Sequence, residues 1–191
     1  MRFSRVAIVL VVVVIVVVAC FAFLGTSYLS DFIGGPSGGP TAYATFSYEA
    51  SVSLYIPTTT SSSDWPKVTN AEVTRLTADV EPYQGPDQGR VVAPPSNPLK
   101  GGAKMIGQIW FHIEVTGTKG YKANWTSDKT ALIATTSPQI FGQSSGRCFF
   151  DHNGEYTVSL FVNVDLLDMV GGDYVWGGIV TYKTVTFEVN V

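Results

Sequence analysis

The sequence predicts an all-β domain, a two-sheet antiparallel sandwich, preceded by one N-terminal transmembrane or signal helix. Three observations lead to this prediction. An uninterrupted apolar run occupies residues 6–24. Beyond it, apolar and polar residues alternate with a period of two, which is typical of strands that bury one face. Gly, Pro, Asn and Asp cluster between these segments, as expected of the turns of an all-β domain.

The apolar run lies within a predicted N-terminal segment of residues 1–30. As a helix it would rise about 28 Å, close to the roughly 30 Å hydrocarbon core of a bilayer. Arg2 and Arg5 precede it, and the next basic residue is Lys67. This asymmetry predicts a cytoplasmic N-terminus and an extracellular C-terminal domain, as in a single-pass protein of the cell membrane.

Three fates of this segment stay open. It stays as an anchor, or it is removed as a signal peptide and the protein is secreted. In the third, Cys20 is lipidated, since the residues Val-Val-Ala-Cys that end at Cys20 resemble a lipobox. Against this third fate, the sequence remains apolar up to Leu24.

Residues 31–41 form a Gly/Pro linker, and residues 42–191 form the outer domain. The linker contains the run GGPSGGP, in which glycine frees the backbone and proline blocks a helix. The formal net charge of the chain is −3, and the acidic residues are scattered. A nucleic-acid partner is therefore not expected.

Four segments of the outer domain alternate most strictly and predict half-buried strands: residues 45–56, 107–116, 156–164 and 184–191. In the first, the even-numbered residues from Phe46 to Ile56 form the apolar face. The last is expected to turn Val185, Phe187, Val189 and Val191 inward. Weaker strands are predicted at residues 72–80, 90–93, 121–126, 130–135, 147–150 and 174–182. Turns are predicted at residues 83–87, 94–98, 153–154 and 171–173.

Residues 153–160 read NGEYTVSL. This resembles the Gly-x-Tyr-Thr-Val entry to the penultimate strand of immunoglobulin-like and PKD-like domains. The resemblance implies an immunoglobulin-like sandwich, in which Tyr156 makes a tyrosine-corner hydrogen bond back to the preceding loop. A last strand ending at Val191 is similar to the final strand of such domains. The resemblance covers only the C-terminal strands and implies an architecture, not an activity.

No constellation of residues predicts catalysis, so the chain is not expected to be an enzyme. Residues 142–146 read GQSSG and match G-x-S-x-G. A nucleophile elbow needs a helix after the serine, whereas a strand is predicted here. The motif is therefore interpreted as a flexible Gly/Ser loop.

Two sets of side chains have the chemistry of metal ligands. The residue types of a blue-copper site are present in His112, Cys148, His152 and Met169. The oxygen ligands that Ca²⁺ prefers flank a Gly-rich turn at Asp165, Asp168 and Asp173. Neither set has the spacing of an established motif, and we predict no catalytic residue, no cofactor and no metal.

Asn124 begins the glycosylation sequon Asn-Trp-Thr, and the predicted topology places it outside the cell. Trp65, Trp110, Trp125 and Trp176 belong either to the core or to a carbohydrate platform. Trp110 falls opposite the apolar face of its strand, which makes it the best candidate for an exposed contact.

These observations favour a non-enzymatic cell-surface module for adhesion, partner binding or envelope structure. Its expected partners are the membrane, through the N-terminal helix, and a protein or glycan at the surface, with self-association an option. One alternative is a subunit of an extracellular filament, in which residues 45–56 are donated to a neighbouring sheet. A second alternative is a small copper-binding redox protein.

Overall fold

The computed structural model describes residues 39–58, 65–85, 104–168 and 170–191, and Pro40–Val191 forms one compact unit. The predicted N-terminal helix, Cys20 and most of the linker lie outside the described residues. Within the described part of the chain, no helix has both the length and the apolar character needed to cross a bilayer.

The strands are β1 (Ala42–Tyr55), β2 (Lys67–Pro82), β3 (Met105–Gly117), β4 (Tyr121–Thr126), β5 (Thr130–Ile133), β6 (Gln139–Phe150), β7 (Gly154–Leu167) and β8 (Tyr174–Val189). The short 3₁₀ helix η1 (Thr118–Gly120) joins β3 to β4.

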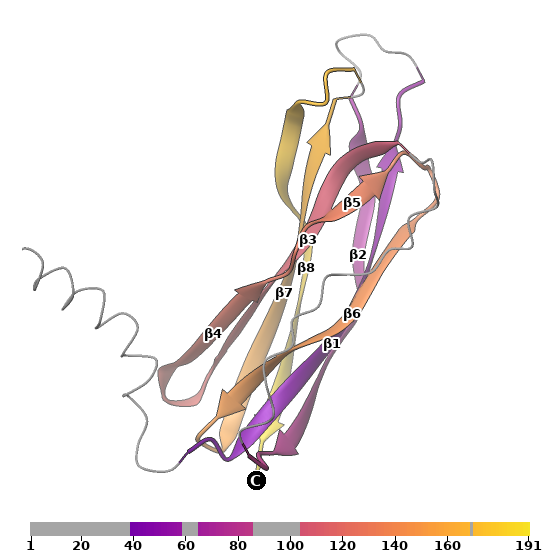
Figure 1. Cartoon of the computed structure of the whole chain (residues 1–191). Helices are drawn as coiled ribbons and strands as arrows, with labels where there is room; N and C mark the ends of the chain where they lie inside the picture. The colour runs from indigo at the N-terminus through magenta and orange to yellow at the C-terminus, as the bar shows by residue number, and fades with distance from the viewer. Residues whose placement is uncertain (1–38, 59–64, 86–103, 169) are drawn as a thin grey trace, which may run out of the picture. The chain divides into compact units, whose positions relative to one another are not determined.

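The described strands form two antiparallel sheets (Figure 1). The three-stranded sheet has the order β2-β1-β6, and the five-stranded sheet has the order β4-β3-β7-β8 with β5 also paired to β3. Buried side chains of both sheets belong to one hydrophobic core. The prediction of an all-β domain with two antiparallel sheets is confirmed, and the arrangement is compatible with a β-sandwich.

The alternation of apolar and polar residues in the sequence matches the alternation of buried and exposed residues along the strands. In β1, Phe46, Tyr48 and Val52 are at most 1% exposed, whereas the odd-numbered residues between them are partly exposed. The same holds in β3 and β7, where every second residue from Ile109 and from Tyr156 enters the core. These inward faces meet because each strand turns one side of its pleat toward the opposite sheet.

The C-terminal strand differs from the prediction. Two separate segments, residues 174–182 and 184–191, were expected, but β8 is continuous because β7 pairs with it along its whole length. Two register shifts, beside Val162 and beside Leu166, take up the extra residues Val180 and Val175 without ending the strand.

Val191 was expected to point inward, and this is wrong. It lies beyond the end of β8 and is 48% exposed. The pairing with β7 stops at Gly154, where β7 begins. The side chain of Asn153 then takes the place of a strand partner: it donates to the Val191 carbonyl oxygen at 3.0 Å and accepts from the Val191 amide at 3.2 Å.

The GQSSG stretch, residues 142–146, was expected to be a flexible loop, and this is also wrong. It lies inside β6 and pairs with β1, with Gly142 opposite Glu49 and Ser145 opposite Phe46. A register shift next to Phe46 absorbs one extra residue. The predicted strand at residues 90–93 and the turn at residues 94–98 lie outside the described residues.

β1 runs along the length of the three-stranded sheet. It has 14 residues and therefore spans about 45 Å. The chain enters at Thr41, whose amide donates to the Phe150 carbonyl oxygen at 2.8 Å, and the C-terminus lies at the same end (Figure 1). The β7–β8 hairpin and the start of β2 lie at the other end, which we call the tip.

β1 is also the central strand of its sheet, hydrogen-bonded to β2 on one side and to β6 on the other. In this structure both of its edges are therefore used within its own domain. The filament alternative needs this segment to pair with a neighbouring chain, whereas here it pairs with β2 and β6 of its own domain.

Candidate functional site

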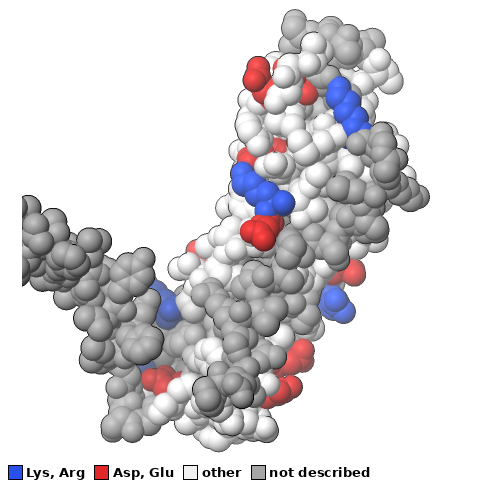
Figure 2. Space-filling model, viewed as in Figure 1, with Lys and Arg blue, Asp and Glu red and all other residues white. Residues whose placement is uncertain are grey.

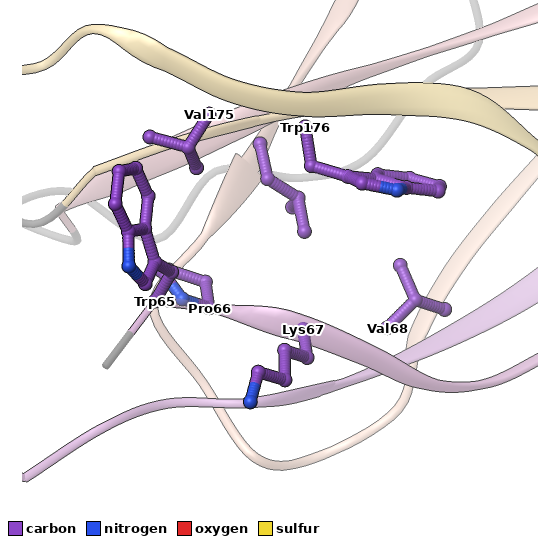
Figure 3. Close-up of a pocket in the computed structure, with 7 residues that line it drawn as sticks. Trp65, Pro66, Lys67, Val68, Val175 and Trp176 are labelled. Carbon is purple, nitrogen blue, oxygen red and sulfur yellow. The ribbon is translucent and has the colours of Figure 1, made fainter. Parts of the chain in front are cut away.

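A pocket of about 380 Å³ opens at the tip, and we call it the tip pocket (Figure 3). Its lining comes from the start of β2, the end of β7 and the start of β8: Trp65, Pro66, Lys67, Val68, Leu166, Val175 and Trp176. Most of these side chains are apolar. Tryptophan, aliphatic residues and an open mouth are typical of ligand sites, which are concave and mainly apolar.

The pocket is the unfilled end of the core between the two sheets. Leu166 on β7 is directly opposite Trp176 on β8, and residues paired in this way project from the same face of a sheet. Leu166 is 1% exposed and ends the core, whereas Trp176 extends past it and is 46% exposed. Trp65, two residues before the start of β2, is 38% exposed and forms the opposite wall (Figure 3).

The hairpin that carries Trp176 is held by its own polar groups. One carboxylate oxygen of Asp168 accepts hydrogen bonds from the amides of Val170, at 3.1 Å, and of Gly172. The Asp168 amide donates to the Asp173 carbonyl oxygen at 2.9 Å, which closes the turn. The Tyr174 hydroxyl donates to Gln108 Oε1 at 3.2 Å. The described residues that support Trp176 are therefore joined by hydrogen bonds.

Few side chains of the lining are of a type that takes part in catalysis. Lys67 is its one charged side chain, and its amine points away from the two indoles in Figure 3. A nucleophile and base within hydrogen-bond reach of each other are needed for covalent catalysis, and the lining holds no such pair. The arrangement is suited to holding an apolar surface against indole faces.

Trp110 lies on the outer face of the five-stranded sheet, where it is half-buried. The Lys129 amine lies over its ring, 4.3 Å from the centroid, and the same amine is 3.0 Å from an Asp165 carboxylate oxygen. The side chain is thus partly covered by its own chain. Of the four tryptophans, Trp65 and Trp176 are the exposed ones. Trp125 packs in the core, with its ring centroid 5.4 Å from that of Phe46.

Asn124 is exposed on β4, at the edge of the five-stranded sheet. Its neighbour Trp125 points into the core, and Thr126 is exposed on the same side as Asn124. Both polar residues of the sequon therefore lie on the surface.

The Tyr156 side chain is 1% exposed, and its hydroxyl donates a hydrogen bond to the His152 carbonyl oxygen at 2.9 Å. The bond reaches back four residues, into the loop between β6 and β7. It fixes the start of β7 against the loop that brings the chain from the other sheet.

Tyr156→Phe will lower the free energy of unfolding by about 1 kcal/mol, because it removes this hydrogen bond and leaves the His152 carbonyl oxygen without its donor. Equilibrium urea unfolding measures the change. Tyr174→Phe is the matched control. Tyr174 is 61% exposed, so this substitution is expected to change the free energy of unfolding by nearly zero. Equal effects of the two substitutions would show that the Tyr156 bond does not hold the loop.

Asp151 and His152 form a second contact in this loop, with 2.7 Å between Asp151 Oδ1 and His152 Nδ1. The hydrogen bond from His152 holds the pKa of Asp151 below its ordinary value. The folded pKa is thus the lower one. The ionised carboxylate therefore stabilises the fold above the unfolded pKa, and this contribution is lost as the pH falls through the folded pKa.

Asp151→Asn will consequently be less stable than the wild type near neutral pH, and the difference will shrink in acid. The effect will be small, because the carboxylate is 37% exposed and screened by water. Urea unfolding at neutral pH and at about pH 3, below the ordinary aspartate range, measures it. Asp128→Asn, at an exposed aspartate before β5, is the control. A difference that grows in acid would contradict the assigned sign.

The residues of the copper alternative are not brought together. His112 lies on the outer face of the five-stranded sheet, 3.0 Å from Thr126 Oγ1 and 3.2 Å from Glu114 Oε1. Cys148 is buried in the core and hydrogen-bonded to the Tyr121 hydroxyl. His152 is bonded to Asp151, and Met169 is outside the described residues.

Two of the three aspartates of the calcium alternative use their carboxylates elsewhere. Asp165 pairs with Lys129, and Asp168 accepts hydrogen bonds from its own loop. Among all described residues, no group of three or more His, Cys, Asp or Glu side chains is placed to hold a metal ion. The GQSSG motif lies within a strand, so it lacks the strand-to-helix turn of a nucleophile elbow.

Sequence reasoning considered Trp65 and Trp176 only as members of a set of tryptophans. They are far apart in the chain, and only the path of β2 and β8 through the two sheets brings them to one pocket. A usable signal was present: Trp65 lies two residues before a strand, and Trp176 follows the Gly-rich turn of a hairpin. Both positions are at strand ends, where binding residues often lie.

Charge does not mark an alternative site. On the face seen in Figure 2, acidic and basic side chains of the described residues are interspersed rather than gathered into one field. The tip pocket is therefore the best-defined site of the described domain. No family model, no curated protein and no solved structure matches this chain.

Proposed function

We propose that this protein is a non-enzymatic, membrane-tethered module of the cell surface that binds a saccharide through the tip pocket. The observation that carries the proposal is the pair of partly exposed indoles, Trp65 and Trp176, on the walls of an open apolar pocket. Exposed tryptophan is costly to leave in water and is enriched where proteins bind partners.

A saccharide suits this pocket because a sugar ring has two chemically different parts. Its C–H face is apolar and carries partial positive charge, so it stacks on the negative face of an indole. Its hydroxyl groups need hydrogen bonds, and an open pocket leaves them in water at no desolvation cost. A peptide would need partners for its backbone N–H and C=O groups, and the polar side-chain groups of the lining are only Lys67 and the two indole N–H groups.

The sequence supplies the rest of the proposal. Arg2 and Arg5 before the apolar run favour an outward-facing domain. The chain enters that domain at the end opposite the tip, so a tether at Thr41 leaves the pocket about 45 Å from the entry point. An immunoglobulin-like relationship, supported by the Tyr156 hydrogen bond, is part of the proposal and concerns the architecture alone.

Tryptophan fluorescence tests the binding. The full chain in lipid nanodiscs is titrated with cellotriose, chitotriose, maltotriose and mannotriose, and with a proline-rich peptide of similar mass. We expect a saturable change with at least one saccharide, with half-saturation below about 1 mM. Saturation by the peptide alone would replace the saccharide with a protein partner. No saturation by any probe would refute the pocket as a site for these ligands.

A further inference from the structure

The outer face of the five-stranded sheet carries apolar side chains. Ile179 and Tyr182, both on β8, are 58% and 68% exposed. Phe161 on β7 stacks on Tyr182 with 6.0 Å between ring centroids, and His112 on β3 lies 6.1 Å from Phe161. We call the row formed by His112, Phe161 and Tyr182 the outer-face ladder, since the three residues are direct partners across neighbouring strands.

The row continues to the sequon. Thr126 on β4 is the direct partner of His112, and its hydroxyl is 3.0 Å from His112 Nδ1. Beside this row the sheet is hollowed by about 220 Å³, and the lining includes Thr126, His112, Phe161 and Ile179. The hollow thus begins at the third residue of the sequon.

Asn124 lies next to this surface. It is the direct partner of Glu114 and projects from the same face as Thr126, two residues away. It also begins the one Asn-x-Ser/Thr sequon of the sequence in which x is not proline. From Asn124 to the ring of Phe161 is about 7 Å along the strand and about 10 Å across two strand spacings.

We infer that Asn124 carries an N-linked glycan whose first sugars pack against the outer-face ladder. The apolar C–H faces of these sugars cover the exposed ring of Tyr182 and the partly exposed rings of Phe161 and His112. The distance of about 12 Å from Asn124 to Phe161, the middle residue of the ladder, is short enough for the first few rings of a glycan. This site is separate from the tip pocket and shares with the proposed function only the outward topology.

The modification is a transfer from a lipid-linked oligosaccharide phosphate. The amide nitrogen of Asn124 forms a bond to the anomeric carbon, and the bond from that carbon to the phosphate oxygen breaks. The amide proton leaves with the released lipid phosphate. In the folded protein the Thr126 hydroxyl is bonded to His112, and β4 is paired to β3, so the transfer precedes the pairing of these strands.

Intact mass and glycopeptide analysis of the full chain from its native membranes tests the site. We expect added sugar mass on the peptide that contains Asn124. The addition will be lost in Asn124→Gln and Thr126→Val and kept in Thr126→Ser, which retains the sequon. An unmodified Asn124 in the wild type would overturn the inference, whatever the tip pocket binds.

A double-mutant cycle tests the packing. Asn124→Gln will lower the melting temperature by about 2–4 °C in the wild-type background. The loss will be clearly smaller in a Tyr182→Ala background, because the glycan then lacks the most exposed ring of the ladder. It will persist in an Ile140→Ala background, a matched control at a residue of the other sheet that is 56% exposed. An equal loss in all three backgrounds would overturn the packing of the glycan on the ladder.

Discussion

Phe150→Ala will lower the free energy of unfolding by about 3–5 kcal/mol, the range for removing a buried phenylalanine. Phe150 is the last residue of β6 and is fully buried. Its ring centroid lies 4.5 Å from that of Tyr156, 5.1 Å from that of Tyr121 and 5.8 Å from that of Phe187. These partners belong to the five-stranded sheet, so the substitution removes a contact that joins the two sheets.

Phe149→Ala is the matched control. Phe149 is adjacent in the chain but projects from the opposite face of β6, where it is half-buried. Its ring centroid lies 6.4 Å from that of Tyr43 and 5.6 Å from that of Tyr83. We expect a loss of about 1 kcal/mol, because less apolar area leaves water. Equilibrium urea unfolding measures both variants. Comparable losses would contradict the inward and outward assignment of β6.

Trp176→Ala will weaken saccharide binding about 30-fold, which corresponds to about 2 kcal/mol, the size expected of a tryptophan that anchors a ligand. Trp65→Ala will have an effect of the same order, because the ligand lies between the two walls. Stability will change little, since both side chains are more than a third exposed. Fluorescence titration is ambiguous once a tryptophan is removed, so isothermal calorimetry measures the affinity.

Trp110→Ala provides the control for the loss of a tryptophan elsewhere. Trp110 lies on the outer face of the sheet beneath Lys129, and its removal is expected to leave the affinity unchanged. Trp176→Phe will keep part of the binding because a smaller aromatic face remains. An effect of Trp110→Ala as large as that of Trp176→Ala would place the saccharide on the outer face instead.

The sequence was most informative where one strand face is buried. In β1, β3 and β7 a one-residue slip would put charged or polar groups into the core, so the period of two determines which residues face inward. The same reasoning was less informative at β8. Its residues Trp176, Ile179 and Tyr182 are apolar yet exposed, so apolar character did not indicate burial there.

Other features depend on pairing partners that no local pattern reveals. Residues 142–146 have the composition of a loop, but β1 supplies a continuous ladder of partners and they form a strand. Glycine and serine are poor strand formers by themselves, and tertiary pairing overrides this preference. The tip pocket required the same knowledge, because Trp65 and Trp176 come together only through the arrangement of the two sheets.

Binding to intact cells tests the central claim most directly. Cells that display the full chain are incubated with a fluorescent form of the saccharide that binds in titrations. They are compared with cells that display the Trp65→Ala/Trp176→Ala double variant at equal surface amounts. We predict saturable labelling of wild-type cells, its loss after extracellular protease treatment, and none with the double variant. Labelling that appears only after lysis, or that is equal in the two cell lines, would contradict an outward-facing module that binds saccharide through its tip pocket.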